Sequence, residues 1–199
     1  MKVYGDRLSG NCYKISLLMS LLDINHQWID VDVRSGETAT QDFLKLNPFG
    51  KIPVIELDDG CTLAESNAIL HYLAAGSRYI NDEPFFHGNI LKWQFFEQYS
   101  HEPYIAVARF INRYLGLPAE RRAEYESKQA GGHAALRIMQ SQLETSPYLV
   151  GEQYTIADIS LFAYTHVANE GGFDLTRYPA IEAWIERIES EPGHVGMGA

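Results

Sequence analysis

A chain of 199 residues can fold as one large domain or two small ones, and a composition of 46% hydrophobic and 21% charged residues excludes a largely disordered protein. Acidic residues number 26 against 16 basic ones, and the resulting formal charge of −10 disfavours nucleic acid and anionic lipid surfaces as partners. No apolar run reaches membrane-spanning length and the first residues lack the apolar core of a secretory signal, so we expect a cytoplasmic protein that does not bind membranes.

The first 76 residues alternate between strand and helix patterns. In chain order they predict a strand at residues 3–4, a helix at 11–22, a strand at 26–33, a helix at 40–46, a hairpin at 54–63 and a helix at 65–75. This β-α-β-α-β-β-α order has a parallel first half and an antiparallel second half, which is the thioredoxin-like order. We therefore predict an α/β domain over residues 1–76.

A polar, turn-rich segment at residues 77–85 is predicted to be a linker. Beyond it we find no strand pattern, and long alanine- and aromatic-rich stretches predict helices at residues 86–115 and 119–143. Thr155 and Asp158 form a capping-box pattern that opens a third helix, and Pro179 opens a last one that ends near residues 191–193. Residues 86–199 are thus predicted to form an all-α helical bundle domain.

The two cysteines show no CxxC or Cys/His spacing, so we expect neither a disulfide framework nor a metal site. Cys61 adjoins strand-like residues and is predicted to be a small core residue. Cys12 follows Ser9 at the spacing of a thioredoxin-type CxxC motif in which serine replaces the exposed first cysteine. In the inward position of that motif, Cys12 is predicted to be a buried, inert thiol.

Three segments of the first domain combine polar residues with turn residues. They are Ser9-Gly10-Asn11-Cys12, Asn47-Pro48-Phe49-Gly50-Lys51-Ile52-Pro53-Val54 and Leu63-Ala64-Glu65-Ser66-Asn67-Ala68-Ile69. Together they resemble the glutathione transferase family, in particular its serine-type and bacterial members, and the resemblance extends over essentially the whole chain. It implies an enzyme that binds glutathione as co-substrate, uses no metal, attacks a small hydrophobic electrophile in detoxification, and forms a homodimer.

The first segment joins a strand to the amino end of a helix, where backbone N–H groups favour a negative charge. A thiol with a pKa of ~8.5 is about 3% ionised at pH 7, and lowering that pKa by about two units requires about 2.7 kcal/mol of differential stabilisation. The resemblance assigns the donor that stabilises the glutathione thiolate to Ser9, with Asn11 as a second catalytic candidate. Tyr4 and Cys12 stay open as alternatives, and an isolated Ser9 would simply cap the helix.

The second segment is implied to bind the glycyl and cysteinyl parts of glutathione. By the resemblance, Lys51 pairs with the glycyl carboxylate, and a cis bond between Ile52 and Pro53 exposes the Ile52 backbone to the cysteinyl part. Some serine-type members have a histidine contact before the second helix, but residues 35–39 contain none here. Thr38 or Arg34 could replace that contact.

The third segment places Glu65 and Ser66 at the start of a predicted helix. By the resemblance, Ser66 holds the γ-glutamyl carboxylate and Glu65 takes the ligand's ammonium group. The alternative for both is a purely local role, in which Glu65 favours the helix dipole and Ser66 caps the helix.

The electrophile is expected between this face and the predicted helix at residues 86–115, with Tyr104, His101 and Arg109 as substrate candidates. Aromatic residues at helical spacing are more often core than pocket, and Arg109 could equally pair with a carboxylate. Two other functions stay open: another glutathione-dependent reaction, such as isomerisation, peroxide or disulfide reduction or dehalogenation, and a non-catalytic binding or regulatory role.

Overall fold

The computed structural model describes all of residues 1–199 and divides into two compact units. The first unit contains Met1–Ser77 together with Glu191–Ala199, and the second contains Arg78–Ser190. The sequence predicts that the first domain ends at residue 76 and that residues 191–199 belong to the helical domain. In the structure these last residues belong to the first unit instead.

The first unit has the predicted thioredoxin-like order. Its elements are β1 (Lys2–Gly5), α1 (Gly10–Leu21), β2 (Gln27–Asp30), α2 (Gln41–Leu46), β3 (Val54–Glu56), β4 (Thr62–Ala64) and α3 (Ser66–Ala74). The sheet order is β2-β1-β3-β4, with β1 and β2 parallel and the other two pairings antiparallel. Strand β2 is shorter than predicted because the Asp32 carboxylate accepts the N–H groups of Arg34 and Ser35 and closes a turn.

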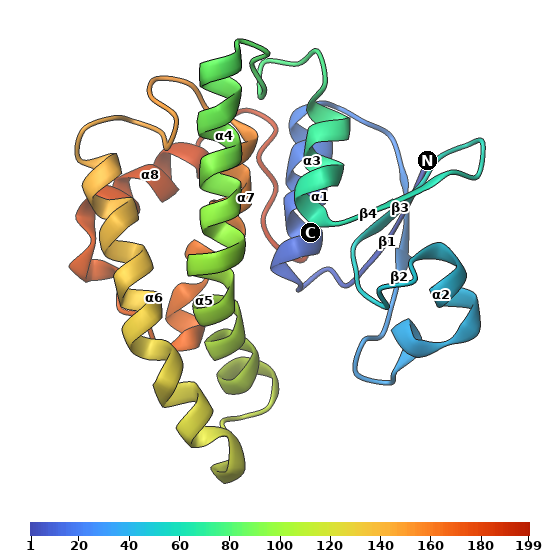
Figure 1. The fold of residues 1–199 in the computed structure, drawn as a ribbon, viewed down its shortest axis with the longest axis horizontal. Helices are drawn as coiled ribbons and strands as arrows, with labels where there is room; N and C mark the ends of the chain where they lie inside the picture. The colour runs from blue at the N-terminus through green and yellow to red at the C-terminus, as the bar shows by residue number, and fades with distance from the viewer. The chain divides into compact units, whose positions relative to one another are not determined.

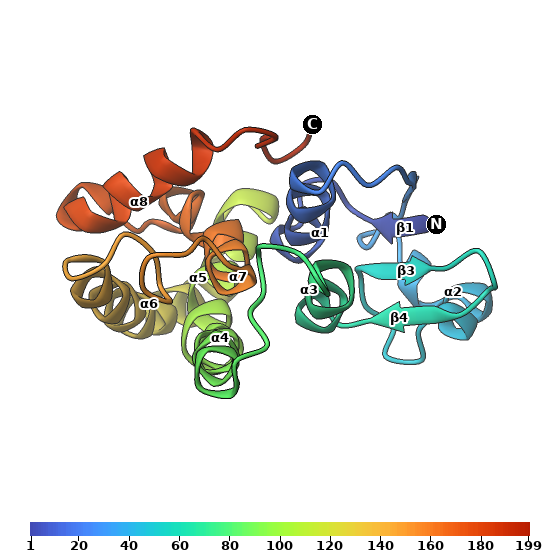
Figure 2. The ribbon, with the colours of Figure 1, turned by 90° about the horizontal axis from the view of Figure 1, so that it is seen from above.

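Helices cover both faces of this sheet. Helices α1 and α3 lie on one face and α2 lies on the other (Figures 1 and 2). On the α2 face, Val31, Phe43 and Val54 form a buried cluster, and Tyr4 and Ile52 pack against it. The alternation of side chains along each strand explains this arrangement, because neighbouring residues of a strand point to opposite faces.

The segment Glu191–Ala199 joins the first unit through side chains of α1 and of the loop before it. The Tyr13 hydroxyl donates to the Val195 carbonyl at 2.7 Å, and the Ser20 hydroxyl donates to the Gly193 carbonyl at 2.7 Å. The Arg7 guanidinium donates to the Ala199 carbonyl oxygen at 2.6 Å. These three bonds explain why the segment groups with residues far away in the chain.

The second unit is all-helical, as predicted. Its helices are α4 (Pro84–Phe96), α5 (Glu102–Arg109), α6 (Arg122–Leu143), α7 (Ile156–Thr165) and α8 (Pro179–Glu189). The predicted helix at 86–115 is observed as α4 and α5 with π-helical turns at Glu97–His101 and Phe110–Tyr114. Pro103 has no N–H for the helical ladder, and the π-helical turn immediately before α5 accommodates this loss.

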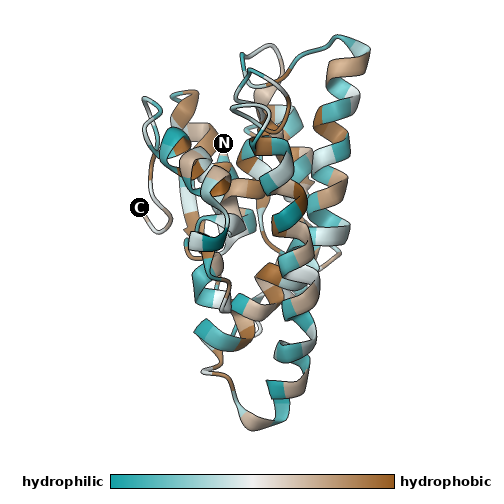
Figure 3. Ribbon diagram, turned by 90° about the vertical axis from the view of Figure 1, so that its left-hand side faces the viewer, coloured by the Kyte–Doolittle hydropathy of each residue, from teal (hydrophilic) through white to brown (hydrophobic).

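Helix α7 forms the centre of the second unit, because all ten of its residues are buried. Its start is the predicted capping box between Thr155 and Asp158. Asp158 is fully buried and accepts hydrogen bonds from the Leu149 N–H at 2.8 Å and the Trp184 indole at 3.0 Å. Other helices combine apolar and polar residues along their length (Figure 3). No helix is both long and apolar enough to span a bilayer.

Candidate functional site

The three predicted segments meet at one end of the sheet. Tyr4 pairs with Val54, and Val54 pairs with Ala64, so β1 ends where β3 begins and where β4 ends. Ser9 follows the end of β1, Pro53 precedes β3, and Glu65 follows β4. Antiparallel pairing therefore brings together segments that are far apart in the chain.

Ser9 is the residue before α1, but its side chain makes no capping hydrogen bond. The backbone carbonyl of Ser9 accepts the first helical bond, from the Tyr13 N–H at 2.8 Å. The Ser9 side chain acts to lower the pKa of the Cys12 thiol, against the larger effect of burial. The purely local capping role therefore does not describe the Ser9 side chain.

Cys12 is fully buried, as predicted, and the Cβ of a residue larger than glycine at Gly5 would lie 2.8 Å from its sulfur. Burial raises the pKa of the Cys12 thiol to about 12, although the Ser9 side chain acts in the opposite direction. A thiol that stays protonated near neutral pH is a weak nucleophile. This geometry favours an inert Cys12 over a redox-active one.

The prediction for Cys61 is wrong, because this residue is exposed and does not lie in the core. It directly precedes β4 in the hairpin, where its N–H donates to the Asp59 carboxylate at 2.9 Å. The hydrogen bond and negative charge of Asp59 also raise the pKa of the Cys61 thiol.

Asn11 and Ser66 connect the first and third segments directly. The Ser66 hydroxyl donates to Asn11 Oδ1 at 3.1 Å, and Lys14 Nζ donates to Ser66 Oγ at 3.2 Å. Ser66 is the first residue of α3 and is only 6% exposed. The amino ends of α1 and α3 are thus joined by hydrogen bonds between side chains.

Tyr4 has a different partner from the one that a sulfur-binding role requires. Its hydroxyl donates to the Glu56 carboxylate at 2.5 Å, and this bond raises the pKa of Tyr4. Lys2 also donates to Glu56, at 3.1 Å. The Tyr4 hydroxyl proton is therefore directed at Glu56, within the sheet.

The second segment is held by a buried asparagine. Asn47 is 2% exposed, donates from Nδ2 to the Lys51 carbonyl at 2.7 Å, and accepts the Phe49 N–H at 3.0 Å. The bond between Ile52 and Pro53 is cis, as the resemblance implied, and the Lys51 side chain is exposed. Asn47 thus braces the loop that presents Lys51, a role that the sequence did not reveal although the Asn-Pro pair indicates a turn.

Glu65 adopts a left-handed backbone with φ of 69°, which is rare for a residue with a side chain. Strain of this kind costs about 1–3 kcal/mol and collects at functional sites. Glu65 is exposed and makes no side-chain capping bond, so it remains accessible to a ligand. Thr38 is half-buried in a short 3₁₀ turn, Glu37–Ala39, while Arg34 is exposed.

In the structure, the three substrate candidates contact other residues of the helical unit. His101 is fully buried and bonds Thr165 Oγ1 at 2.9 Å. Arg109 is 4% exposed and donates from Nε to the Glu170 carboxylate at 2.6 Å. The half-buried ring of Tyr104 packs so closely against Gly131 that no side chain would fit there. This burial disfavours His101 and Arg109 as groups that contact a substrate.

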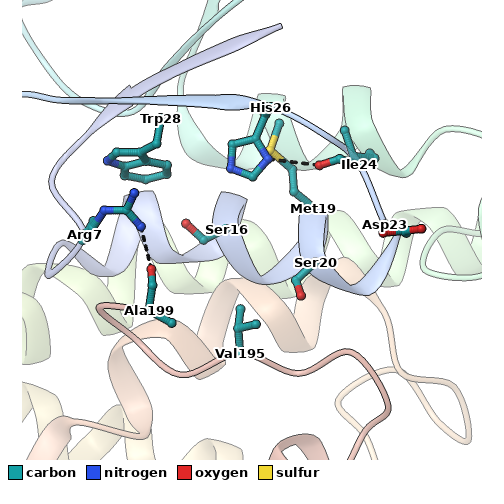
Figure 4. A pocket seen from close by; sticks show the side chains of 10 residues that line it. All are labelled: Arg7, Ser16, Met19, Ser20, Asp23, Ile24, His26, Trp28, Val195 and Ala199. Carbon is teal, nitrogen blue, oxygen red and sulfur yellow. Dashed lines mark hydrogen bonds between the residues drawn. The ribbon is translucent and has the colours of Figure 1, made fainter.

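Hollows also lie elsewhere on both units. One, of about 380 Å³, is bounded by α5 and by the charged pair of Arg121 and Glu124 in the helical unit. Another, of about 290 Å³, lies on the first unit between α1, the segment leading to Trp28, and the final residues (Figure 4). Here the Arg7 guanidinium lies 5.0 Å from the centre of the Trp28 ring. None of the predicted glutathione-binding residues lines either hollow.

The fold and the site define a two-unit protein with a thioredoxin-like first unit whose site has hydroxyl and amide groups in place of an exposed cysteine. No group of three or more acidic, histidine or cysteine side chains is placed to hold a metal ion. Residues 8–75 match the glutathione S-transferase N-terminal domain, and residues 92–192 match the glutathione S-transferase C-terminal domain.

Three individual relatives support these family matches. The crystal structure of a glutathione S-transferase from Pseudomonas fluorescens is 60% identical, with a TM-score of 0.98 over 100% of this chain and 98% of that chain. A glutathione S-transferase from Xanthobacter autotrophicus is 43% identical, with a TM-score of 0.96 over 99% of this chain and 96% of that one. The disulfide-bond oxidoreductase YfcG of Escherichia coli is 31% identical over 189 residues, or 92% of this chain and 87% of that protein. The chain belongs to the glutathione S-transferase family.

Proposed function

We propose that this protein is a glutathione transferase whose first unit binds glutathione and holds its sulfur as a thiolate for attack on a hydrophobic electrophile. The main support is the hydrogen bond between Ser66 and Asn11, because it joins the residue assigned to the ligand's carboxylate to a residue assigned to its sulfur. A thiolate at the amino end of α1 gains from the orphan N–H groups of the first helical turn and from side-chain donors. The attack then forms a carbon–sulfur bond, and the leaving group departs with the electron pair.

Each part of glutathione has a proposed partner. Lys51 pairs with the glycyl carboxylate, and the Ile52 backbone before the cis Pro53 binds the cysteinyl part. The first amides of α3 and Ser66 hold the γ-glutamyl carboxylate, while Glu65 takes the ammonium. A solved structure of this fold from a Pseudomonas fluorescens family member holds two glutathione molecules. Thr38 is proposed as a further contact from its half-buried turn.

Ser9 and Asn11 are both proposed as donors to the sulfur, and single substitutions distinguish them. Ser9→Ala removes the hydroxyl of the residue before α1, and Asn11→Ala removes the acceptor of the Ser66 hydroxyl. We expect each variant to raise the pKa of bound glutathione, which is measured by thiolate absorbance. The variant that lacks the main donor should raise this pKa by one to two units, which corresponds to about 10- to 100-fold less thiolate at low pH. Conjugation of chlorodinitrobenzene should fall in parallel. An unchanged pKa in both variants would refute this account of the sulfur site.

Disulfide reduction is the second candidate function, and the similarity to the disulfide-bond oxidoreductase YfcG favours it specifically. In this reaction a glutathione thiolate attacks one sulfur of a disulfide and releases a thiolate, which takes up a proton. A second glutathione then attacks the mixed disulfide, giving oxidised glutathione and the second thiol. Turnover of hydroxyethyl disulfide that exceeds conjugation of chlorodinitrobenzene under matched conditions would favour this candidate over the transferase.

The electrophile partner and the homodimer are also proposals. Tyr104 remains the proposed electrophile contact of the helical unit, because His101 and Arg109 have interior partners. A homodimer is supported by large apolar side chains that are exposed on α4 and beside it, namely Phe85 at 80%, Phe95 at 60% and Tyr99 at 80%. Analytical ultracentrifugation tests this directly, since a monomer at micromolar concentration would refute the homodimer. We propose a cytoplasmic role in detoxification.

A further inference from the structure

Lys14 is a charged residue in an unusual place. It lies one turn into α1 and has no exposed surface, although lysine is among the residues that are least often fully buried. Placing an ammonium group in the interior is costly unless polar groups receive its protons. One such group is Ser66 Oγ, at 3.2 Å from Lys14 Nζ.

The chemistry of the ammonium group gives the hydrogen bonds a direction. An ammonium can only donate, so Ser66 Oγ accepts from Lys14 and directs its own proton to another group. That group is Asn11 Oδ1, at 3.1 Å. Oδ1 and Nδ2 of an asparagine lie in one plane, on opposite sides of the Cβ–Cγ bond. Once Oδ1 of Asn11 faces Ser66, Nδ2 therefore points away from Ser66.

We propose that Lys14 is a positioning residue for the thiolate site, which through Ser66 orients the Asn11 amide so that its N–H groups face the ligand's sulfur. This inference rests on the proposed function, because it assumes that glutathione binds here. Lys14 acts through two other side chains and touches neither the sulfur nor the electrophile. The same chain of bonds connects the carboxylate end of the ligand, at Ser66, with its sulfur end, at Asn11.

A direct effect of the Lys14 charge on the sulfur is the competing explanation, because a buried cation also favours a nearby thiolate. The two explanations differ when Asn11 is removed. If Lys14 acts by orienting the Asn11 amide, substituting Lys14 has no further effect on the thiol once Asn11 is alanine. If its charge acts directly, the effect of the substitution persists in that background.

The test compares Lys14→Met, Asn11→Ala and the double variant with the wild-type protein. Methionine fills a similar volume without donating a hydrogen bond. We expect Lys14→Met to raise the pKa of bound glutathione by about one unit, giving about tenfold less thiolate at acidic pH. Conjugation at pH 6.5 should fall by a similar factor and recover near pH 9. Lys45→Met is the matched control, since Lys45 has a 75% exposed side chain that pairs with Asp42, and its substitution should leave both readouts unchanged.

Each outcome has a distinct meaning. A wild-type protein that leaves the pKa of glutathione at its free value refutes the proposed function and this inference together. A wild-type protein that lowers the pKa, combined with an unchanged pKa in Lys14→Met, refutes only the role of Lys14. If Lys14→Met raises the pKa of glutathione equally with and without Asn11, the charge of Lys14 acts directly and the positioning role is refuted. If Lys14→Met does not fold, Lys14→Gln keeps a donor without the charge, and a pKa close to wild type is expected, while a raised pKa overturns the inference.

Discussion

Replacing Gly5 with alanine tests how tightly β1 packs against α1. The added Cβ would lie 2.8 Å from the Cys12 sulfur, 3.1 Å from Cζ2 of Trp28 and 3.2 Å from the Cys12 Cβ. All three distances are shorter than ordinary van der Waals contacts, and Cys12 has no exposed surface toward which it could shift. Overpacking of this kind typically costs about 1–3 kcal/mol.

The measured quantity is the midpoint of thermal unfolding, followed by circular dichroism. For a chain of this size, each 1 kcal/mol of lost stability lowers the midpoint by about 2–4 °C. Gly5→Ala should therefore lower the midpoint by roughly 2–12 °C. Gly88→Ala in α4 is the matched control, because an added Cβ there meets no atom within 4 Å. That control should leave the midpoint unchanged or raise it slightly, since alanine favours a helix by about 0.5–1 kcal/mol over glycine.

A double variant shows whether the Cys12 sulfur is the atom responsible. Cys12→Ala removes the sulfur and leaves room for the new methyl group. Gly5→Ala combined with Cys12→Ala should therefore be more stable than the sum of the two single effects predicts, by about 1 kcal/mol or more. Strictly additive effects, or a Gly5→Ala protein as stable as the wild type, would show that the described contact between β1 and α1 is wrong.

Three further predictions concern individual residues of both units. At pH 8 a disulfide reagent should react with one thiol per chain in the native protein, the exposed Cys61, and with Cys12 only in denaturant, because burial raises the pKa of Cys12 to about 12. A second thiol that reacts in the native protein, or a reactive thiol that survives Cys61→Ser, would contradict this. Burial also raises the pKa of Asp158 from 3.8 to about 6, so its contribution to stability is complete below pH 3.8 and is lost as the pH rises through 6. Relative to Asp158→Asn, the free energy of unfolding of the wild-type protein should therefore fall by up to about 3 kcal/mol over that range, as measured by urea titration. A difference between the two proteins that does not change with pH would show that the pKa of the Asp158 carboxyl is not perturbed. Glu65→Gly should weaken glutathione binding in calorimetry without lowering the unfolding midpoint, since glycine relieves the left-handed backbone, and a large loss of stability would contradict the assigned strain.

Local patterns predicted the elements of the fold well because each depends on nearby residues. The capping box at Thr155 and Asp158 and the turn between β3 and β4 are encoded within a few positions. Strand β2 was predicted too long because residues 31–33 continue its alternation, whereas the Asp32 carboxylate closes a turn that alternation cannot reveal. The position of residues 191–199 depends on bonds to Tyr13 and Ser20, which no local pattern indicates.

The candidate site was likewise predictable from the sequence only in part. The motif residues were named from the sequence, and the sheet register brings their segments together at one end of the sheet. Lys14 was missed because a lysine within an apolar helix gives no sign of whether it is buried, and its partner Ser66 lies 52 positions away. Asn47 was quoted within a motif but received no role, because its two hydrogen bonds depend on the three-dimensional path of the loop.

Burial of Cys12 affects how the protein would withstand oxidants. Peroxides can convert an accessible thiolate irreversibly into sulfinic and sulfonic acids, which inactivates an enzyme that depends on that thiolate. Here the only cysteine beside the site has no exposed surface. Under the proposed function, the sulfur that meets the oxidant arrives with each tripeptide and leaves with it. Damage then consumes a small metabolite, which the cell replaces more easily than a folded chain.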